Sequence, residues 1–201
     1  MDGRTSSRSL GPSRRSVLAA GAGAGLALLG AGAAEAAEHP SLKYMRQVAK
    51  DLLAANRQGT VASFLRAIQR HADIPEIAIY SLGQYKASLP SAQRDLYYRG
   101  VATFMSRYFA DQSREYRVAK YELGEARSDA KDVLVPSKVF LISGATYTVT
   151  WRLSPRGKGY KVTDAKVLGF SLVYMQRNLF TSFLSKRNGD IGQLVAALNR
   201  P

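Results

Sequence analysis

Histidine and cysteine are the side chains that most often support nucleophilic catalysis and metal binding, and this chain has very few of them. It contains no cysteine and only two histidines, His39 and His71. Thiolate chemistry and disulfide bonds are therefore excluded, and two histidines are too few for a two- or three-histidine metal site within one chain. A Gly-x-Ser-x-Gly nucleophile elbow is also missing, so we interpret His71 as a residue at a helix end.

The acidic residues form no pattern typical of an active site either. The pairs Glu122/Glu125 and Asp129/Asp132 fall near an expected strand end and an expected turn, where charges are usually solvated. Glu115 or Asp164 could act as a general acid if it stood in an apolar pocket, but nothing in the sequence supports this. No Gly-x-Gly-x-x-Gly motif joins a strand to a helix, so nucleotide binding is not expected.

Apolar and aromatic side chains are the other material from which a site could be built. The simplest interpretation of any one of them is core packing. A cup formed by a curved sheet and several helices can instead stay partly unfilled and hold an apolar ligand. The sequence therefore favours binding over catalysis.

The composition is that of a folded protein with a strongly basic surface. The 201 residues have 46% apolar and 22% charged side chains, which allows one or at most two compact domains. The formal net charge is +14, and no long run of basic residues carries it. Dispersed charge of this kind is typical of a solvated surface or of attraction to an anionic membrane, and not of a nucleic-acid-binding arm.

The first 36 residues have the features of an export signal. Arg14 and Arg15 precede a glycine- and alanine-rich apolar stretch, and Ala34-Glu35-Ala36 fits a small-x-small cleavage site. The paired arginines favour a twin-arginine signal peptide over a general secretory one, and an uncleaved membrane anchor is the structural alternative. We therefore expect a signal peptide at 1–36, cleavage near Ala36 and a single exported domain at 37–201.

Helical periodicity dominates the first half of that domain. Apolar residues at steps of three and four predict helices over 41–57, with Gly59 ending the first, and over 61–71, with Thr60 as its cap. Asp73 and Pro75 open a third helix that is expected to run through Tyr85 and to close before Pro90. Ser91 begins a long fourth helix, in which Gly100 marks a close approach of another element.

The period changes to two after Tyr116, which predicts strands over 118–124, 133–143, 146–153 and 160–168. The connections between the last three are short enough for antiparallel neighbours only. Two terminal helices, 171–186 and 191–199, complete the chain. The expected fold class is α+β: a twisted antiparallel sheet of about four strands packed by N-terminal and C-terminal helices around an apolar pocket.

Two stretches carry a family resemblance. In the first, Ile79-Tyr80-Ser81-Leu82-Gly83-Gln84-Tyr85 is followed by Ser91-Ala92-Gln93-Arg94, Phe104 and Tyr108; in the second, the segment Gly159–Leu172 is followed by Gln176-Arg177, Phe180, Gly189-Asp190-Ile191 and Leu194. In order and spacing these resemble the toluene-tolerance family of Mla-type periplasmic phospholipid-binding proteins, the soluble carriers of an ABC lipid transport system. Tyr160, Leu168 and Phe170 depart from the family pattern, which leaves the identity of the ligand open. Related carriers of hopanoid pathways are similar in architecture, so a hopanoid-like isoprenoid lipid is an alternative ligand.

The resemblance implies a monomeric periplasmic lipid carrier that is not an enzyme and needs no cofactor or metal. Bound lipid would be its ligand, and its partners would be an inner-membrane ABC transporter complex and an outer-membrane lipoprotein complex. A small exported enzyme and a lipid-free interaction module are the rival function classes. Ten apolar side chains are expected to contact the lipid: Leu82, Tyr85, Phe104, Leu141, Val149, Trp151, Val167, Phe170, Leu172 and Phe180.

Overall fold

The computed structural model describes residues 38–200, and the expected signal peptide lies outside the described residues. Six α-helices occur in this part of the chain: α1 Pro40–Gln58, α2 Val61–His71, α3 Ile74–Ser81, α4 Arg94–Glu115, α5 Leu172–Ser185 and α6 Ile191–Leu198. None of the helices within these residues is both long and apolar enough to span a membrane.

The ends of the first three helices follow from their sequence. Gly59 adopts the left-handed conformation that ends α1, with φ of 64°. The side chains of Thr60 and Asp73 accept hydrogen bonds from Ser63 N and Glu76 N, which caps α2 and α3. These predicted boundaries are confirmed.

The third helix is shorter than predicted. Instead of continuing through Tyr85, α3 ends at Ser81, and residues Gly83–Ser88 form a 3₁₀ turn. Gly83 causes the break, because its φ is +55° and a β-carbon there would lie 2.9 Å from Cγ2 of Thr181 on α5. The close packing of this turn on α5 thus outweighs the helical period of the sequence.

The sheet has six strands, two more than expected. They are β1 Val118–Leu123, β2 Arg127–Asp129, β3 Asp132–Leu141, β4 Thr146–Arg156, β5 Gly159–Val167 and β6 Phe170–Ser171. The order is β1-β3-β4-β5-β6 with β2 also paired to β3, and all these pairs are antiparallel. The prediction missed β2 and β6 because two or three residues are too few to show an alternating pattern.

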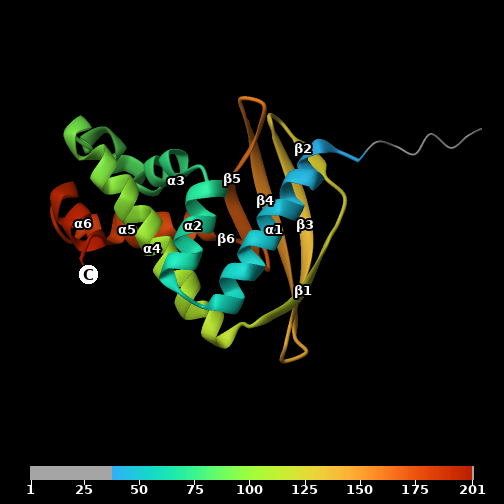
Figure 1. Ribbon diagram of the computed structural model, residues 1–201. Coiled ribbons are helices and arrows are strands. Elements are labelled where there is room, and N and C mark those ends of the chain that lie inside the picture. Colours follow the sequence, from blue (N-terminus) through green and yellow to red (C-terminus); the bar gives the residue numbers. More distant parts are fainter. Residues whose placement is uncertain (1–37, 201) are drawn as a thin grey trace, which may run out of the picture. The chain divides into compact units, whose positions relative to one another are not determined.

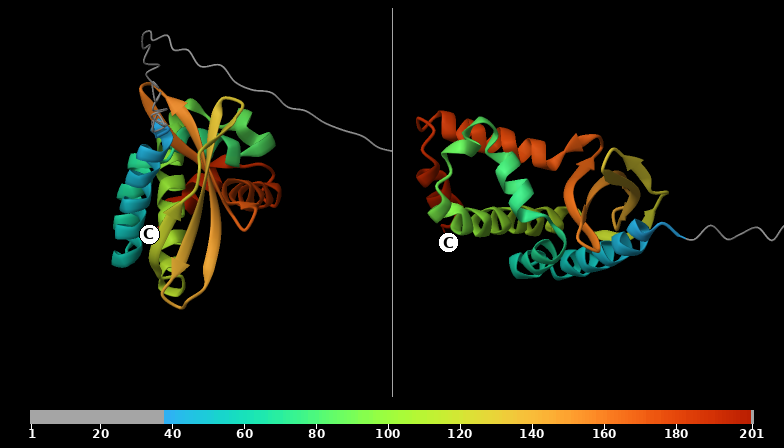
Figure 2. Two further views of the ribbon diagram at one scale, coloured as in Figure 1. Left: turned by 90° about the vertical axis from the view of Figure 1, so that its right-hand side faces the viewer. Right: turned by 90° about the horizontal axis from the view of Figure 1, so that it is seen from above.

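The described domain has the sheet at one end and α6 at the other (Figures 1 and 2). At the sheet end, Met45 and Val48 of α1 pack in one buried cluster with Val135, Leu153 and Val162. A second cluster joins α3, α4, α5 and α6, and a third joins α1, α2 and α4. The sheet is therefore held mainly by α1, and α5 also packs on β5.

Gly100 is the contact point of α4 and α6. A β-carbon at this position would lie 2.8 Å from Cβ of Leu198 and 2.7 Å from the side-chain nitrogen Nδ2 of Asn199. The close approach predicted from a buried glycine in a helix is confirmed, and it fixes the C-terminal helix on α4.

Candidate functional site

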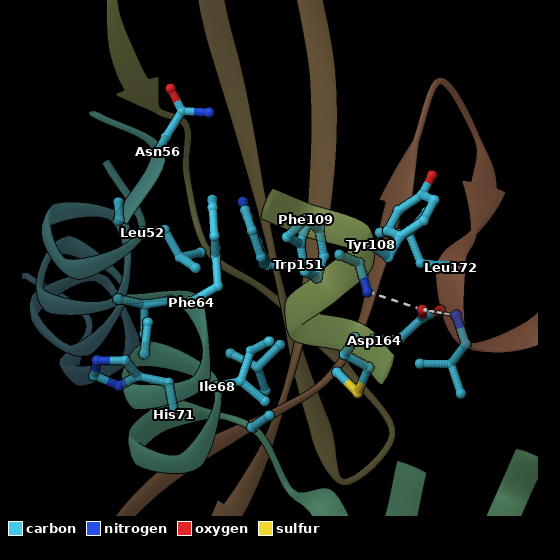
Figure 3. Close-up of a pocket in the computed structure, with 18 of the residues that line it drawn as sticks. Leu52, Asn56, Phe64, Ile68, His71, Tyr108, Phe109, Trp151, Asp164 and Leu172 are labelled. Atoms are coloured by element: carbon cyan, nitrogen blue, oxygen red, sulfur yellow. Dashed lines mark hydrogen bonds between the residues drawn. The ribbon is translucent and has the colours of Figure 1, made fainter. Parts of the chain in front are cut away.

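An apolar cavity lies between the helices and the inner face of the sheet (Figure 3). Its volume is about 540 Å³, which falls within the roughly 300–1,000 Å³ of typical ligand sites. Helices α1 to α5 line it together with strands β1, β3, β4 and β5. Side chains from segments far apart in the sequence thus enclose one space.

The cavity begins where the sheet core ends. Val135 on β3 packs on α1, whereas Ser137 and Val139, further along the same strand, line the cavity. On β4, Leu153 is in the core and Trp151 lines the cavity. One face of the sheet therefore serves both as core and as cavity wall.

The opening is marked by the cavity residues that are also exposed. Tyr108 on α4 is 42% exposed, and Met175 and Leu179 on α5 are 50% and 55% exposed. Exposed apolar side chains that continue the lining of an apolar cavity are typical of a ligand entrance. The entrance therefore lies between α4 and α5.

Ser137 and Gln176 are polar residues of the lining whose side chains form hydrogen bonds within the protein. Ser137 Oγ donates to the carbonyl of Val149 at 3.2 Å and accepts from Trp151 Nε1 at 2.9 Å. Gln176 Nε2 donates to Ser81 Oγ at 2.7 Å, and this hydroxyl in turn donates to the carbonyl of Ile77. These bonds satisfy polar groups that an apolar ligand cannot satisfy.

His71 is the last residue of α2, as predicted, and it also lines the cavity. Its Nε2 lies 2.8 Å from Asp51 Oδ2, and Arg70 and Gln47 donate to the same carboxylate. Burial raises the pKa of Asp51, but the hydrogen bonds from His71, Gln47 and Arg70 outweigh this effect, so the pKa lies below its ordinary value. The cluster holds the C-terminal end of α2 against the interior of α1.

A bulge in β5 lies directly before Asp164, which lines the cavity. Arg152 pairs with Asp164 and Leu153 with Val162, which leaves Thr163 as an extra residue. Asp164 Oδ1 accepts hydrogen bonds from the backbone nitrogens of Ala165 at 2.8 Å and Val173 at 3.2 Å (Figure 3). The carboxylate therefore ties β5 to the first turn of α5.

Glu115, the other candidate acid, is exposed at the end of α4.

The structure brings three of the ten expected lipid contacts together in the cavity, namely Phe104, Trp151 and Leu172. The other seven do not line it. Leu82, Tyr85 and Phe180 pack in the cluster of α3 to α6, Leu141 and Val149 are buried in the sheet, Val167 is half-buried on β5, and Phe170 is 69% exposed on β6.

The sequence interpretation missed the contribution of α1 and α2. Phe64, Ala67 and Ile68 of α2 and Leu52 of α1 line the cavity. These residues belong to the apolar stripes that predicted the helices, but a stripe facing a cavity has the same period as one facing a filled core. Only the size of the enclosed space distinguishes the two.

Within residues 38–200, no three His, Asp or Glu side chains lie together in a way that could hold a metal ion. The two candidate carboxylate pairs differ in the cations that they bind. Asp129 and Asp132 both bind Arg152, at 2.8 Å and 3.1 Å. Glu122 pairs with Lys120 on the surface of β1, and Glu125 is exposed.

Comparisons with known proteins agree with this architecture. Residues 42–200 match the family model described as MlaC protein. A solved structure, a phospholipid-binding protein from Ralstonia solanacearum in complex with a phospholipid, matches with a TM-score of 0.67 and 22% identity over 81% of this chain and 96% of that chain. A search of curated proteins gave no match. The family resemblance and the α+β fold class are thus confirmed.

Proposed function

The chain belongs to the MlaC protein family, and from this membership we propose that it is a periplasmic carrier that holds the acyl chains of a phospholipid in its cavity. The observation that carries the proposal is the apolar cavity of about 540 Å³ with exposed apolar side chains at its entrance. The similar protein from Ralstonia solanacearum, described as holding a phospholipid, supports it.

A phospholipid crosses an aqueous compartment only at a large free-energy cost unless a carrier shields its acyl chains. Two acyl chains contain about 30 methylenes, and exposing each to water costs about 0.8 kcal/mol, so free crossing of an aqueous compartment costs on the order of 24 kcal/mol. A cavity lined by apolar side chains lowers this barrier for the part of the chains that it encloses. The headgroup stays at the entrance, where it remains hydrated.

The wider role follows from the family and from the export signal expected at 1–36. We propose that the domain exchanges lipid with an inner-membrane ABC transporter complex and an outer-membrane lipoprotein complex, and so helps to maintain the lipid asymmetry of the outer membrane. Binding and release of lipid need no covalent step. The role of an enzyme is the rival proposal, and it differs in what the protein would carry when purified.

The decisive experiment is lipid analysis of the full chain expressed with export and purified without detergent. Native mass spectrometry is expected to show a bound species with the mass of a phospholipid. An isoprenoid mass would keep the carrier role and change its cargo. A redox cofactor or metal in place of lipid would contradict the proposal.

A cavity-filling variant with a matched control connects the bound lipid to the cavity. Ala67 on α2 lines the cavity, whereas Ala62 on the same helix is exposed. Ala67→Phe is expected to lower the bound lipid, because the ring occupies space that the acyl chains need, and Ala62→Phe is expected to keep the wild-type amount. Equal lipid content in both variants would place the lipid outside this cavity.

A further inference from the structure

Asp164 is the only acidic side chain in the cavity lining within residues 38–200, and this lining contains no lysine or arginine. A carboxylate in apolar surroundings is costly unless hydrogen bonds or an opposite charge compensate it. The protein supplies part of this compensation, since Oδ1 accepts from the backbone nitrogens of Ala165 and Val173. Within the described residues Oδ2 has no hydrogen-bond donor, and it is not one of the buried polar atoms that lack a partner, so it is open to solvent and free to accept from a ligand.

The position of Asp164 relates this carboxylate to the entrance. Its partner Val173 stands in the first turn of α5, two residues before Met175, which is half exposed at the opening. Leu172, the neighbour of Val173, also lines the cavity (Figure 3). A ligand whose chains fill the cavity and whose headgroup stays at the opening therefore places its headgroup near α5 and Asp164.

A headgroup with a protonated amine complements this site, because an ammonium donates to a carboxylate in a charge-assisted hydrogen bond. An anionic headgroup without an amine gains no such bond and meets a like charge. We propose that Asp164 makes the carrier select lipids whose headgroup carries a protonated amine over lipids with an anionic headgroup. This inference rests on the proposed function and names the class of lipid that the cavity takes.

The test is a competition between two lipids with identical acyl chains. The purified protein is incubated with vesicles of equimolar phosphatidylethanolamine and phosphatidylglycerol, and the two bound lipids are quantified by mass spectrometry. The wild type is expected to favour phosphatidylethanolamine about tenfold, the ratio of one charge-assisted hydrogen bond of about 1.4 kcal/mol. Asp164→Asn keeps the shape and an oxygen that accepts from the backbone, and it is expected to bring the ratio close to one.

Asp190 provides a matched control. Its carboxylate also accepts from the backbone at a helix start, at 3.2 Å from Gln193 N, but it is exposed at α6 and does not line the cavity. Asp190→Asn is expected to keep the wild-type ratio. A purely structural role of Asp164 would lower stability in Asp164→Asn and leave the ratio unchanged, which would overturn the inference.

If Asp164→Asn does not fold, the competition experiment on the wild-type protein alone still tests whether the carrier selects lipids by their headgroup. Equal uptake of both lipids would overturn the selection by headgroup and leave the carrier role intact. Uptake of neither lipid would overturn both proposals. Phosphatidylcholine, which has the same headgroup charge but no N–H donor, is expected to compete less well than phosphatidylethanolamine; equal competition would overturn the hydrogen bond as the cause.

Discussion

Trp151 is the only tryptophan of the chain, and its indole forms part of the cavity wall (Figure 3). The ring is held in place because Nε1 donates to Ser137 Oγ at 2.9 Å. Its fluorescence therefore reports on this one site. We expect lipids brominated on their acyl chains to quench Trp151 when they bind, whereas the same lipids brominated on the headgroup quench it less.

The Ala67→Phe variant serves as the control for this measurement, because its filled cavity should leave little quenching by either lipid. Strong quenching by headgroup bromine would reverse the expected orientation, with the chains outside and the headgroup inside. No quenching by either lipid would separate lipid binding from this cavity.

The Asp51 carboxylate makes the stability of the folded protein depend on pH. Its pKa is lower in the folded protein than its ordinary value. Such a carboxyl stabilises the fold above its unfolded pKa of about 3.9, and this contribution disappears as the pH falls through the folded-state pKa. Asp51→Asn is therefore expected to be less stable than wild type at pH 7, and the difference should shrink below about pH 4.

Denaturant unfolding at several pH values measures this difference. Asp111 offers a control, because it is exposed and its nearest cation, Arg114, is 3.9 Å away. Asp111→Asn is expected to follow the wild type at every pH. If the difference in free energy of unfolding between Asp51→Asn and wild type stayed constant down to pH 2, this would contradict the ionic origin of the stabilisation.

At the scale of elements, the hairpin between β5 and β6 holds an unusual backbone. Leu168 and Gly169 have φ of +51° and +88°, and they connect the paired residues Val167 and Phe170. Two positive φ values in a two-residue loop are typical of a type I′ turn, for which asparagine followed by glycine is preferred. Leucine is strained there, and its side chain is 60% exposed.

Leu168→Asn is therefore expected to raise the free energy of unfolding by about 0.5–1 kcal/mol, because asparagine tolerates the left-handed region better than leucine. Thermal or denaturant unfolding measures the change. Ile142 is an exposed apolar residue in another turn and does not have a positive φ, so Ile142→Asn should give no gain. A loss of stability in Leu168→Asn would mean that the leucine makes a contact worth more than the strain.

Some helix ends could be predicted from the sequence alone, and others could not. Local signals were sufficient for the ends of α1 and α2, because Gly59 and Thr60 act on their own backbone neighbours. The end of α3 depends on the contact of Gly83 with Thr181, almost a hundred residues away, and no local pattern contains it. The same holds for the bulge at Thr163, which places Ala165 opposite Trp151 in the cavity wall.

At the scale of the whole molecule, five of the basic residues line a second groove, and one of these, Arg46, is paired with Glu38. Lys43, Arg46, Lys50 and Arg57 of α1 and Lys158 of the β4–β5 turn line it, and no acidic side chain is among the described residues of its wall. Without residues 1–36, which hold four of the 29 basic and two of the 15 acidic residues, the chain keeps 25 and 13 and a net charge of +12. An electric field of this sign attracts anionic membranes.

We therefore expect lipid transfer from anionic vesicles to slow as the ionic strength rises from about 0.01 M to 0.15 M, because the Debye length falls from about 30 Å to about 8 Å. Lys43→Gln with Lys50→Gln should slow transfer at low salt and reduce its dependence on salt. Arg94→Gln with Arg99→Gln removes the same charge from exposed positions on α4. A weaker effect of the α4 pair would assign the attraction to the groove, whereas equal effects would assign it to net charge. Transfer that does not depend on salt would leave the basic surface with a role in solubility alone, because an attraction between separated charges in water must weaken when mobile ions screen it.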